Sequence, residues 1–249
     1  MATSASDDLK TRVANELDAT LKLIDDTQRR SVRAIIPGPV WLRAARGCWL
    51  LAEMDWSANF YKRAAISILQ SAQDDGRRQG FYAPLALLAI GAAWMSGDRD
   101  LLATTGSTID EACRSLIANT DLSPEPLVAA SLHLTRIRVA WFQGRGESIQ
   151  RLMPDLERAV RGLDKWGEWY WEAERDIHTL TVFRTLLAQK PDPIKACIQK
   201  YNQYLVAQQA KSPTITELVD EEFISFASAV QDLGIELARV TLPIVPGKL

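Results

Sequence analysis

The densest group of side chains that could bind a metal or move protons lies between residues 168 and 178. It consists of Glu168, Glu172, Glu174, Asp176 and His178. Glu174 and His178 are four residues apart, so a helix would place them on one face. A dinuclear carboxylate site in a helical bundle needs a Glu-x-x-His pair on each of two helices, and neither histidine of this chain follows a glutamate at that spacing. We therefore interpret the group as solvated helical charge and predict no metal site.

The remaining nucleophiles and loops give no better case for catalysis. Cys48, Cys113 and Cys197 are far apart among apolar residues, which is typical of reduced core thiols and not of a zinc site or a disulfide framework. A nucleophile would need one of the two histidines or a carboxylate of raised pKa as its base. The Gly144-Arg145-Gly146 run follows no strand, so it predicts a helix stop and not a phosphate-binding loop. We expect no catalytic residue and no cofactor, and hence a protein that is not an enzyme.

Acidic runs occur at or near the expected helix ends. They are Asp25-Asp26, Asp74-Asp75 and Asp220-Glu221-Glu222. Negative charge at the start of a helix complements the helix dipole. We expect these runs to be solvating or dipole-complementing charge, and not the acid and base of a hydrolase.

Tryptophan is present in surplus and points to a contact surface. The chain has eight tryptophans, three of them within residues 166–171. One helix face cannot hold all three, so one group belongs in the core and the other is either buried by a neighbouring helix or displayed beside Glu168 and Glu172. Tryptophan is favoured where a partner removes water from a surface. The candidate partner-binding residues are Trp166, Glu168, Trp169, Trp171 and Glu172.

The elements that must position these residues are helices. Apolar residues recur at helical spacing along nearly the whole chain. The expected helices span residues 6–26, 41–54, 56–73, 81–95, 101–119, 127–143, 147–163, 166–189, 193–211 and 216–233. The segment 101–119 is expected to be either a pair of helices or one helix interrupted near Gly106, and residues 74–80 are expected to form an exposed loop.

Short connections of glycine, proline and aspartate force such helices to pack on their sequence neighbours as antiparallel hairpins. The predicted fold is all-α: an irregular bundle or short solenoid of antiparallel helix hairpins with about ten helices. Residues 1–249 are expected to form a single helical domain, in which residues 1–5 and 243–249 are extended or flexible ends.

Composition limits the partners and the location. Lys and Arg total 29 against 31 for Asp and Glu, so no overall field would attract nucleic acid or anionic lipid. The apolar run 85–95 is shorter than the roughly 20 residues of a membrane span, and the polar N-terminus lacks a signal-peptide pattern. We expect a cytoplasmic protein that binds neither nucleic acid nor membrane; the oligomeric state stays open.

The closing third of the chain resembles a known family. The resemblance covers residues 182–187, 194–208 with Tyr201 and Tyr204, 222–227, 232–236 and 242–246. These segments are similar to the end of immunity protein family 49, and the apolar helix and acidic turn of 85–100 are similar to its middle. Members of that family look like all-helical bacterial cytoplasmic proteins found beside polymorphic toxins.

The resemblance implies a non-catalytic protein that binds a cognate protein toxin and neutralises it by occlusion, and it carries over no individual binding residue. The alternative is a tetratricopeptide-like scaffold or regulator that acts through protein interactions, for which the turn at residues 97–102 is the supporting feature. A third class is an enzyme whose site combines scattered helical carboxylates with His178.

Overall fold

The computed structural model describes residues 2–30, 35–79, 83–118, 126–160, 173–188, 191–209 and 219–234. Within these ranges there are ten helices and no strand, which confirms the all-α prediction. The helices are α1 (Ala2–Arg30), α2 (Gly38–Leu50), α3 (Met54–Gln79), α4 (Ala83–Met95), α5 (Arg99–Ala118), α6 (Pro126–Phe142), α7 (Gly146–Val160), α9 (Ala173–Leu187), α10 (Pro191–Gln209) and α12 (Glu221–Asp232).

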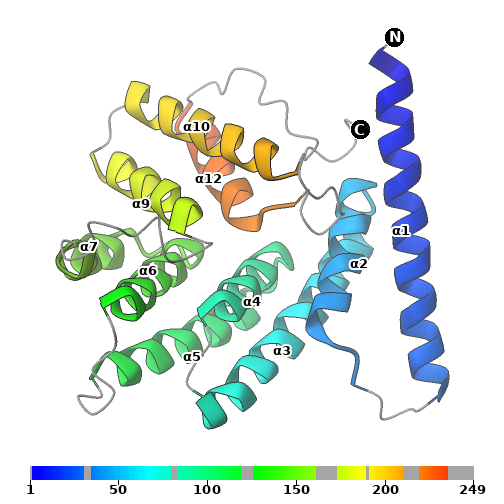
Figure 1. Cartoon of the computed structure of the whole chain (residues 1–249), viewed down its shortest axis with the longest axis horizontal. Coiled ribbons are helices and arrows are strands. Elements are labelled where there is room, and N and C mark those ends of the chain that lie inside the picture. The colour runs from blue at the N-terminus through cyan, green and yellow to red at the C-terminus, as the bar shows by residue number, and fades with distance from the viewer. Residues whose placement is uncertain are drawn as a thin grey trace.

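Packing between sequence neighbours organises the array. Each helix from α1 to α7 packs on the next one in the chain, and α9 packs on α10. Helix α4 packs on α6 as well. Figure 1 shows these hairpins following one another around the molecule, from α1 on one side to α7 on the other. The last described helix, α12, returns to pack on α10 and α4. The predicted arrangement of a helical bundle or short solenoid is therefore confirmed.

Buried apolar side chains form two core clusters that meet at α6. The first cluster comes from α1 to α5 and one face of α6, and the second from another face of α6 with α7, α9, α10 and α12. Trp141 on α6 packs against both clusters. Each fully buried large apolar side chain contributes about 1.5–3 kcal/mol to the stability of the fold.

Glycines close two of the hairpin turns. Gly97 and Gly144 have φ values of 71° and 68° and follow the ends of α4 and α6. After α6 the Gly144 amide donates to the Trp141 carbonyl and the Arg145 amide to the Ala140 carbonyl, a pattern that satisfies the last carbonyls of a helix. The prediction that residues 144–146 stop a helix is confirmed, and α7 starts at once.

Several expectations about boundaries need correction. Helix α2 spans Gly38–Leu50 and not 41–54, because the chain turns at residues 51–53, where Ala52 has a φ of 63°. Residues 219 and 220, expected to be helical, precede the start of α12. Helix α3 continues to Gln79, so residues 74–79 are helical and not a loop, because one interior glycine costs a helix only about 1 kcal/mol. Helix α1 begins at Ala2, so residues 2–5 are helical and not extended. Helix α5 is continuous through Gly106. The expected extended end at 243–249 lies outside the described residues.

A close approach explains Gly106. The Gln143 side chain donates to the carbonyls of Leu102 and Ala103 on α5 at 3.2 Å each. A Cβ at Gly106 would lie 2.2 Å from the Gln143 Nε2. The glycine thus makes room for the turn after α6 and does not interrupt its own helix.

The three cysteines are not bonded to one another in the structure. Cys48 and Cys113 are buried, as expected of core thiols, whereas Cys197 is half-buried. Among the described residues, no helix combines the length and apolar character that crossing a membrane requires.

Candidate functional site

The start of α12 carries three consecutive acids. Asp220 is the N-cap: its backbone is extended and its Oδ1 accepts from the Phe223 amide at 2.8 Å. Glu221 and Glu222 occupy the first turn, where the helix dipole favours negative charge. Both glutamates are nevertheless buried, with exposed fractions of 5% and 1%. The expectation of solvating charge is therefore wrong for these two residues, and the reason is a set of buried arginines.

Glu221 binds an arginine of α2. The Arg46 Nε and Nη2 donate to Oε1 and Oε2 of Glu221 at 2.7 and 2.6 Å, a bidentate and buried ion pair. The Tyr61 hydroxyl on α3 donates to the same carboxylate at 3.2 Å. A Cβ at Gly91 on α4 would lie only 3.1 Å from the Glu221 Cβ, so the glycine permits α12 to sit this close.

Glu222 binds an arginine of α6. The Arg138 Nε donates to its Oε1 at 2.7 Å and the Nη2 to its Oε2 at 3.2 Å. The same Nη2 donates to the Asp176 Oδ1 on α9 at 2.7 Å. The Thr179 hydroxyl, also on α9, donates to the Glu222 Oε2 at 3.0 Å. One guanidinium therefore holds two carboxylates from two other helices.

Asp220 binds a third arginine. The Arg175 Nη2 on α9 lies 3.0 Å from the Asp220 Oδ2 and 3.7 Å from the Glu222 Oε2. The Arg175 Nε donates to the Tyr201 hydroxyl on α10 at 3.3 Å. The Tyr201 hydroxyl in turn donates to the Glu222 Oε2 at 3.3 Å.

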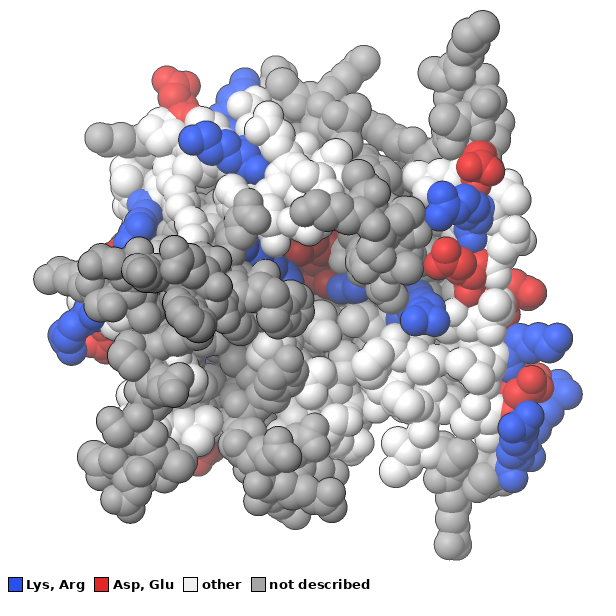
Figure 2. All heavy atoms as spheres, viewed as in Figure 1, with Lys and Arg blue, Asp and Glu red and all other residues white. Residues whose placement is uncertain are grey.

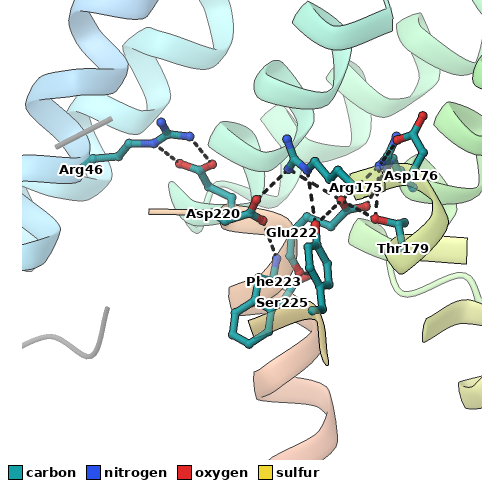
Figure 3. A network of polar contacts seen from close by, with 11 residues as sticks. Arg46, Arg175, Asp176, Thr179, Asp220, Glu222, Phe223 and Ser225 are labelled. Carbon is teal, nitrogen blue, oxygen red and sulfur yellow. Dashed lines mark hydrogen bonds and ion pairs between the residues drawn. The ribbon is translucent and has the colours of Figure 1, made fainter. Parts of the chain in front are cut away.

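These contacts form one arginine–carboxylate network (Figure 3). Its charged members are Arg46, Arg138, Arg175, Asp176, Asp220, Glu221 and Glu222. In the space-filling view of Figure 2, acidic and basic atoms meet near the middle of the face, whereas most other charged side chains in that view lie towards its edges. Glu221 ties α12 to helices of the first core cluster and Glu222 ties it to helices of the second.

The network contains three arginines and four acids, so its charges nearly cancel. Burial opposes ionisation of Glu222, yet Arg138 and Arg175 hold its pKa below the ordinary value. Burial raises the pKa of Asp220, and Arg175 offsets this only in part. Burial also raises the pKa of the Tyr61 and Tyr201 phenols well above the ordinary value. The phenols therefore stay protonated at neutral pH and act as hydrogen-bond donors.

The arrangement is better suited to holding helices together than to chemistry. Each of the four carboxylates contacts at least one guanidinium. Within the described ranges, no group of three or more His, Cys, Asp or Glu residues has the geometry to hold a metal ion. A buried acid that is bound to an arginine has little freedom to move a proton to or from a substrate.

The two histidines lie on different helices, His178 on α9 and His133 on α6. His178 on α9 stacks on Tyr201 with ring centroids 5.6 Å apart, and its ring lies 5.1 Å from that of Tyr204. The side chain of Glu174, its expected neighbour, lies outside the described residues. His133 is half-buried; burial lowers its pKa, and its buried Nδ1 has no hydrogen-bond partner in the described part of the chain.

The structure does not describe the residues that the sequence proposed as a contact site. Trp166, Glu168, Trp169, Trp171 and Glu172 all fall within residues 161–172, outside the described ranges. Their role as a contact site stays a prediction.

Sequence reasoning missed the network, although a signal was present. Arg138 stands four residues after Leu134 and three before Trp141, which places an arginine on an apolar helical stripe. Arg46 stands in the same way between Leu42 and Trp49. A charge at a core position needs a buried partner, so both arginines predict acids that arrive from elsewhere in the chain.

An exposed tryptophan on α3 is a second feature that the sequence reasoning did not single out. Trp56 is 63% exposed, and its ring lies 5.8 Å from that of Phe60. Phe60 stacks on Trp41 at 5.7 Å, and the Arg63 guanidinium lies 4.8 Å above the Trp41 ring. Beside Trp56 in the sequence, Met54 is also half exposed. A supported tryptophan of this kind is typical of protein-binding surfaces.

Comparison with protein-family models, with curated proteins and with solved structures found no match to this chain. The resemblance of the closing third to immunity protein family 49 therefore stays an expectation from the sequence. The function is inferred from the network and the exposed aromatic surface.

Proposed function

We propose that this protein is a non-catalytic, immunity-type protein that binds a cognate protein toxin in the cytoplasm and neutralises it by occlusion. The observation that carries the proposal is Trp56, a tryptophan displayed to solvent on top of a buried aromatic stack. Tryptophan and arginine dominate the binding energy of protein interfaces. Because the Trp56 ring packs on Phe60, which itself stacks on Trp41, little side-chain freedom is lost when a partner covers it.

The arginine–carboxylate network supports the same function. An inhibitor that works by occlusion gains affinity when its binding surface is already rigid before the partner arrives. Bonds from α12 reach α2, α3, α6, α9 and α10 and so join both core clusters. The acids and arginines of the network hold the helices together, so recognition of the partner falls to the outer surfaces of the helices.

Charge and sequence add to the argument. The formal net charge of −2 does not suit a strongly basic nuclease toxin, whose inhibitors rely on a large acidic face. The closing segments resemble immunity protein family 49, and this resemblance implies binding to a cognate toxin. We infer a partner of moderate charge that is recognised through an aromatic contact.

Co-expression with the product of the adjacent gene tests the proposal. We expect the protein to restore growth of cells that express that product and to co-purify with it. Trp56→Ala should abolish both effects without changing the melting temperature by more than a few degrees, since the ring is mostly exposed. Val206→Ala on α10 removes another solvent-facing apolar side chain, which is 41% exposed, and should change neither.

The outcomes separate clearly. Absence of both rescue and complex formation with the wild-type protein would reject the immunity function. Rescue by Trp56→Ala as strong as that by the wild type would show that Trp56 does not carry it.

The tetratricopeptide-like scaffold is the alternative. The packing of α4 on both α5 and α6 resembles the stacking of successive hairpins in a solenoid. A scaffold of that kind binds peptides on the inner surface of its array, the side that the successive hairpins face. In this protein α12 occupies that side, since it packs on α4 and α10 and is held by Arg46 of α2 and Arg138 of α6. Binding of peptides only after α12 is displaced would favour the scaffold over the inhibitor.

A further inference from the structure

Arginines line a groove on the outside of α5, α6 and α7. One hollow of about 330 Å³ lies between these three helices and is lined by Arg114, Arg136, Arg145 and Arg151 together with Asp110 and Ser148. A second hollow of about 490 Å³ is lined by Arg99, Ser107 and Gln143, and again by Arg145. Arg145 borders both hollows, and we call the two together the arginine groove.

The groove has an excess of positive charge. Asp110 is the one acid among the described residues that line either hollow, and two arginines already share it: the Arg136 Nε at 2.8 Å and the Arg114 Nη2 at 2.7 Å. The exposed Arg151 contacts the Ser148 hydroxyl, and the exposed Arg99 and Arg145 have no acidic partner in the described part of the chain. Five arginines against one acid stand out on a protein whose net charge is −2.

The length of the groove indicates the kind of ligand. Arg99 and Arg114 lie on the same helix, 15 positions apart, which is about 22 Å at 1.5 Å per residue. The hydrogen bonds from Gln143 to Leu102 and from Arg136 to Asp110 show that α6 runs antiparallel beside this stretch of α5. A single phosphate cannot reach both ends, whereas an extended peptide covers about 22 Å with roughly seven residues.

The lining favours carboxylates over nucleic acid. Neither hollow has an aromatic residue among its described lining, so nothing there would stack on a base. The guanidinium fork matches a carboxylate with two parallel hydrogen bonds. The protein uses that geometry elsewhere, since Arg184 holds Glu157 at 2.6 Å through both donors.

We propose that this arginine groove binds an extended acidic segment of the partner protein. The inference rests on the proposed function for the identity of the partner, but the groove can be tested without it. A fluorescein-labelled hepta-glutamate peptide is the probe, and its fluorescence anisotropy reports binding. The peptide should bind the full-length protein at about 0.05 M NaCl and bind more weakly at about 0.3 M, because salt screens the charges.

Variants locate the binding. The double variant Arg145→Gln/Arg151→Gln removes two exposed charges and leaves the Asp110 pairs intact, and it should weaken binding by about tenfold or more. Arg30→Gln/Arg43→Gln, on α1 and α2, removes the same charge from exposed positions elsewhere and should leave binding unchanged. Hepta-glutamine should not bind.

Three results would overturn the inference. The first is no binding of hepta-glutamate at the lower salt concentration. The second is an equal loss of hepta-glutamate affinity in the two double variants. The third is tighter binding of a hepta-thymidylate oligonucleotide than of hepta-glutamate, which would assign the groove to nucleic-acid phosphates.

Co-expression separates this inference from the proposed function. If the wild type restores growth and Arg145→Gln/Arg151→Gln does so equally well, the groove has no part in partner binding and the immunity function stands. If the peptide binds the groove but the wild type gives no rescue, the immunity function fails and the groove still binds acidic segments.

Discussion

Arg138 on α6 holds Glu222, 84 residues later in the chain, through two hydrogen bonds of 2.7 and 3.2 Å. Both side chains are almost completely buried. The pair is therefore a long-range constraint that fixes the first turn of α12 against the second core cluster.

Arg138→Met should destabilise the protein by about 3–5 kcal/mol, because Glu222 and Asp176 both lose the guanidinium that neutralises them in the interior. Urea unfolding measures the effect. The matched control is Arg184→Met, which breaks the exposed pair with Glu157 and should cost about 1 kcal/mol or less.

The double variant Arg138→Met/Glu222→Met should recover part of the loss, since it removes a buried charge together with its partner. Equal losses for Arg138→Met and Arg184→Met would show that the network adds nothing to stability.

Stability should fall on acidification through Glu222. Its pKa is lowered in the folded protein from the ordinary value of 4.5, so below that value the unfolded chain takes up a proton before the folded chain does. The free energy of unfolding then decreases as pH falls towards the folded pKa. Asp220 acts in the opposite sense, because its folded pKa is raised and the folded chain takes up its proton first.

Urea unfolding between about pH 3 and pH 5 tests this. Glu222→Gln should be less stable at neutral pH and should lose less stability over that range than the wild type. Parallel curves for the two proteins would contradict the assignment.

Replacing Gly38, at the start of α2, should destabilise the protein. A Cβ at Gly38 would lie 2.3 Å from the Ile68 Cγ1 and 2.9 Å from the Ile68 backbone nitrogen, so α2 and α3 would have to separate. Gly38→Ala should cost about 1–3 kcal/mol or more in thermal unfolding. Gly146→Ala, at the start of α7, meets open space and should not destabilise the protein. A harmless Gly38→Ala would contradict the tight packing of α2 on α3.

The thiols should differ in reactivity. Burial raises the pKa of Cys48 and of Cys113 to about 12, so neither forms appreciable thiolate at pH 8. Iodoacetamide should label the native protein at Cys197 alone, and Cys197→Ser should remove the labelling. In denaturant, all three cysteines should react. Rapid native labelling of Cys48 or Cys113 would show that the first core cluster opens easily.

The regular part of the fold was predictable, because each helix shows its own periodicity. The start of α6 is displaced by one residue from the expected position, as is its end. The predicted end of α3 was wrong because charged residues and one glycine, which extend this helix into solvent, have the composition of a loop.

The network was beyond this reasoning for a different reason. Periodicity shows that Arg138 lies on an apolar stripe, but not that Glu222 and Asp176 approach it from α12 and α9. The helix dipole alone accounts for acids at the start of a helix. The acidic run before α12 therefore gave no reason to expect buried arginine partners.

Hydrogen exchange of α12 in the free protein tests the central claim most directly, namely that α12 fills the inner surface of the array and leaves the outside for recognition. We predict that the amides of residues 223–232 exchange as slowly as those of α6 and α9, through global unfolding only. Exchange more than about a hundredfold faster in α12 than in α6 and α9 would show that this helix detaches on its own. The inner surface would then be open to peptides, and the network would not hold α12 in place.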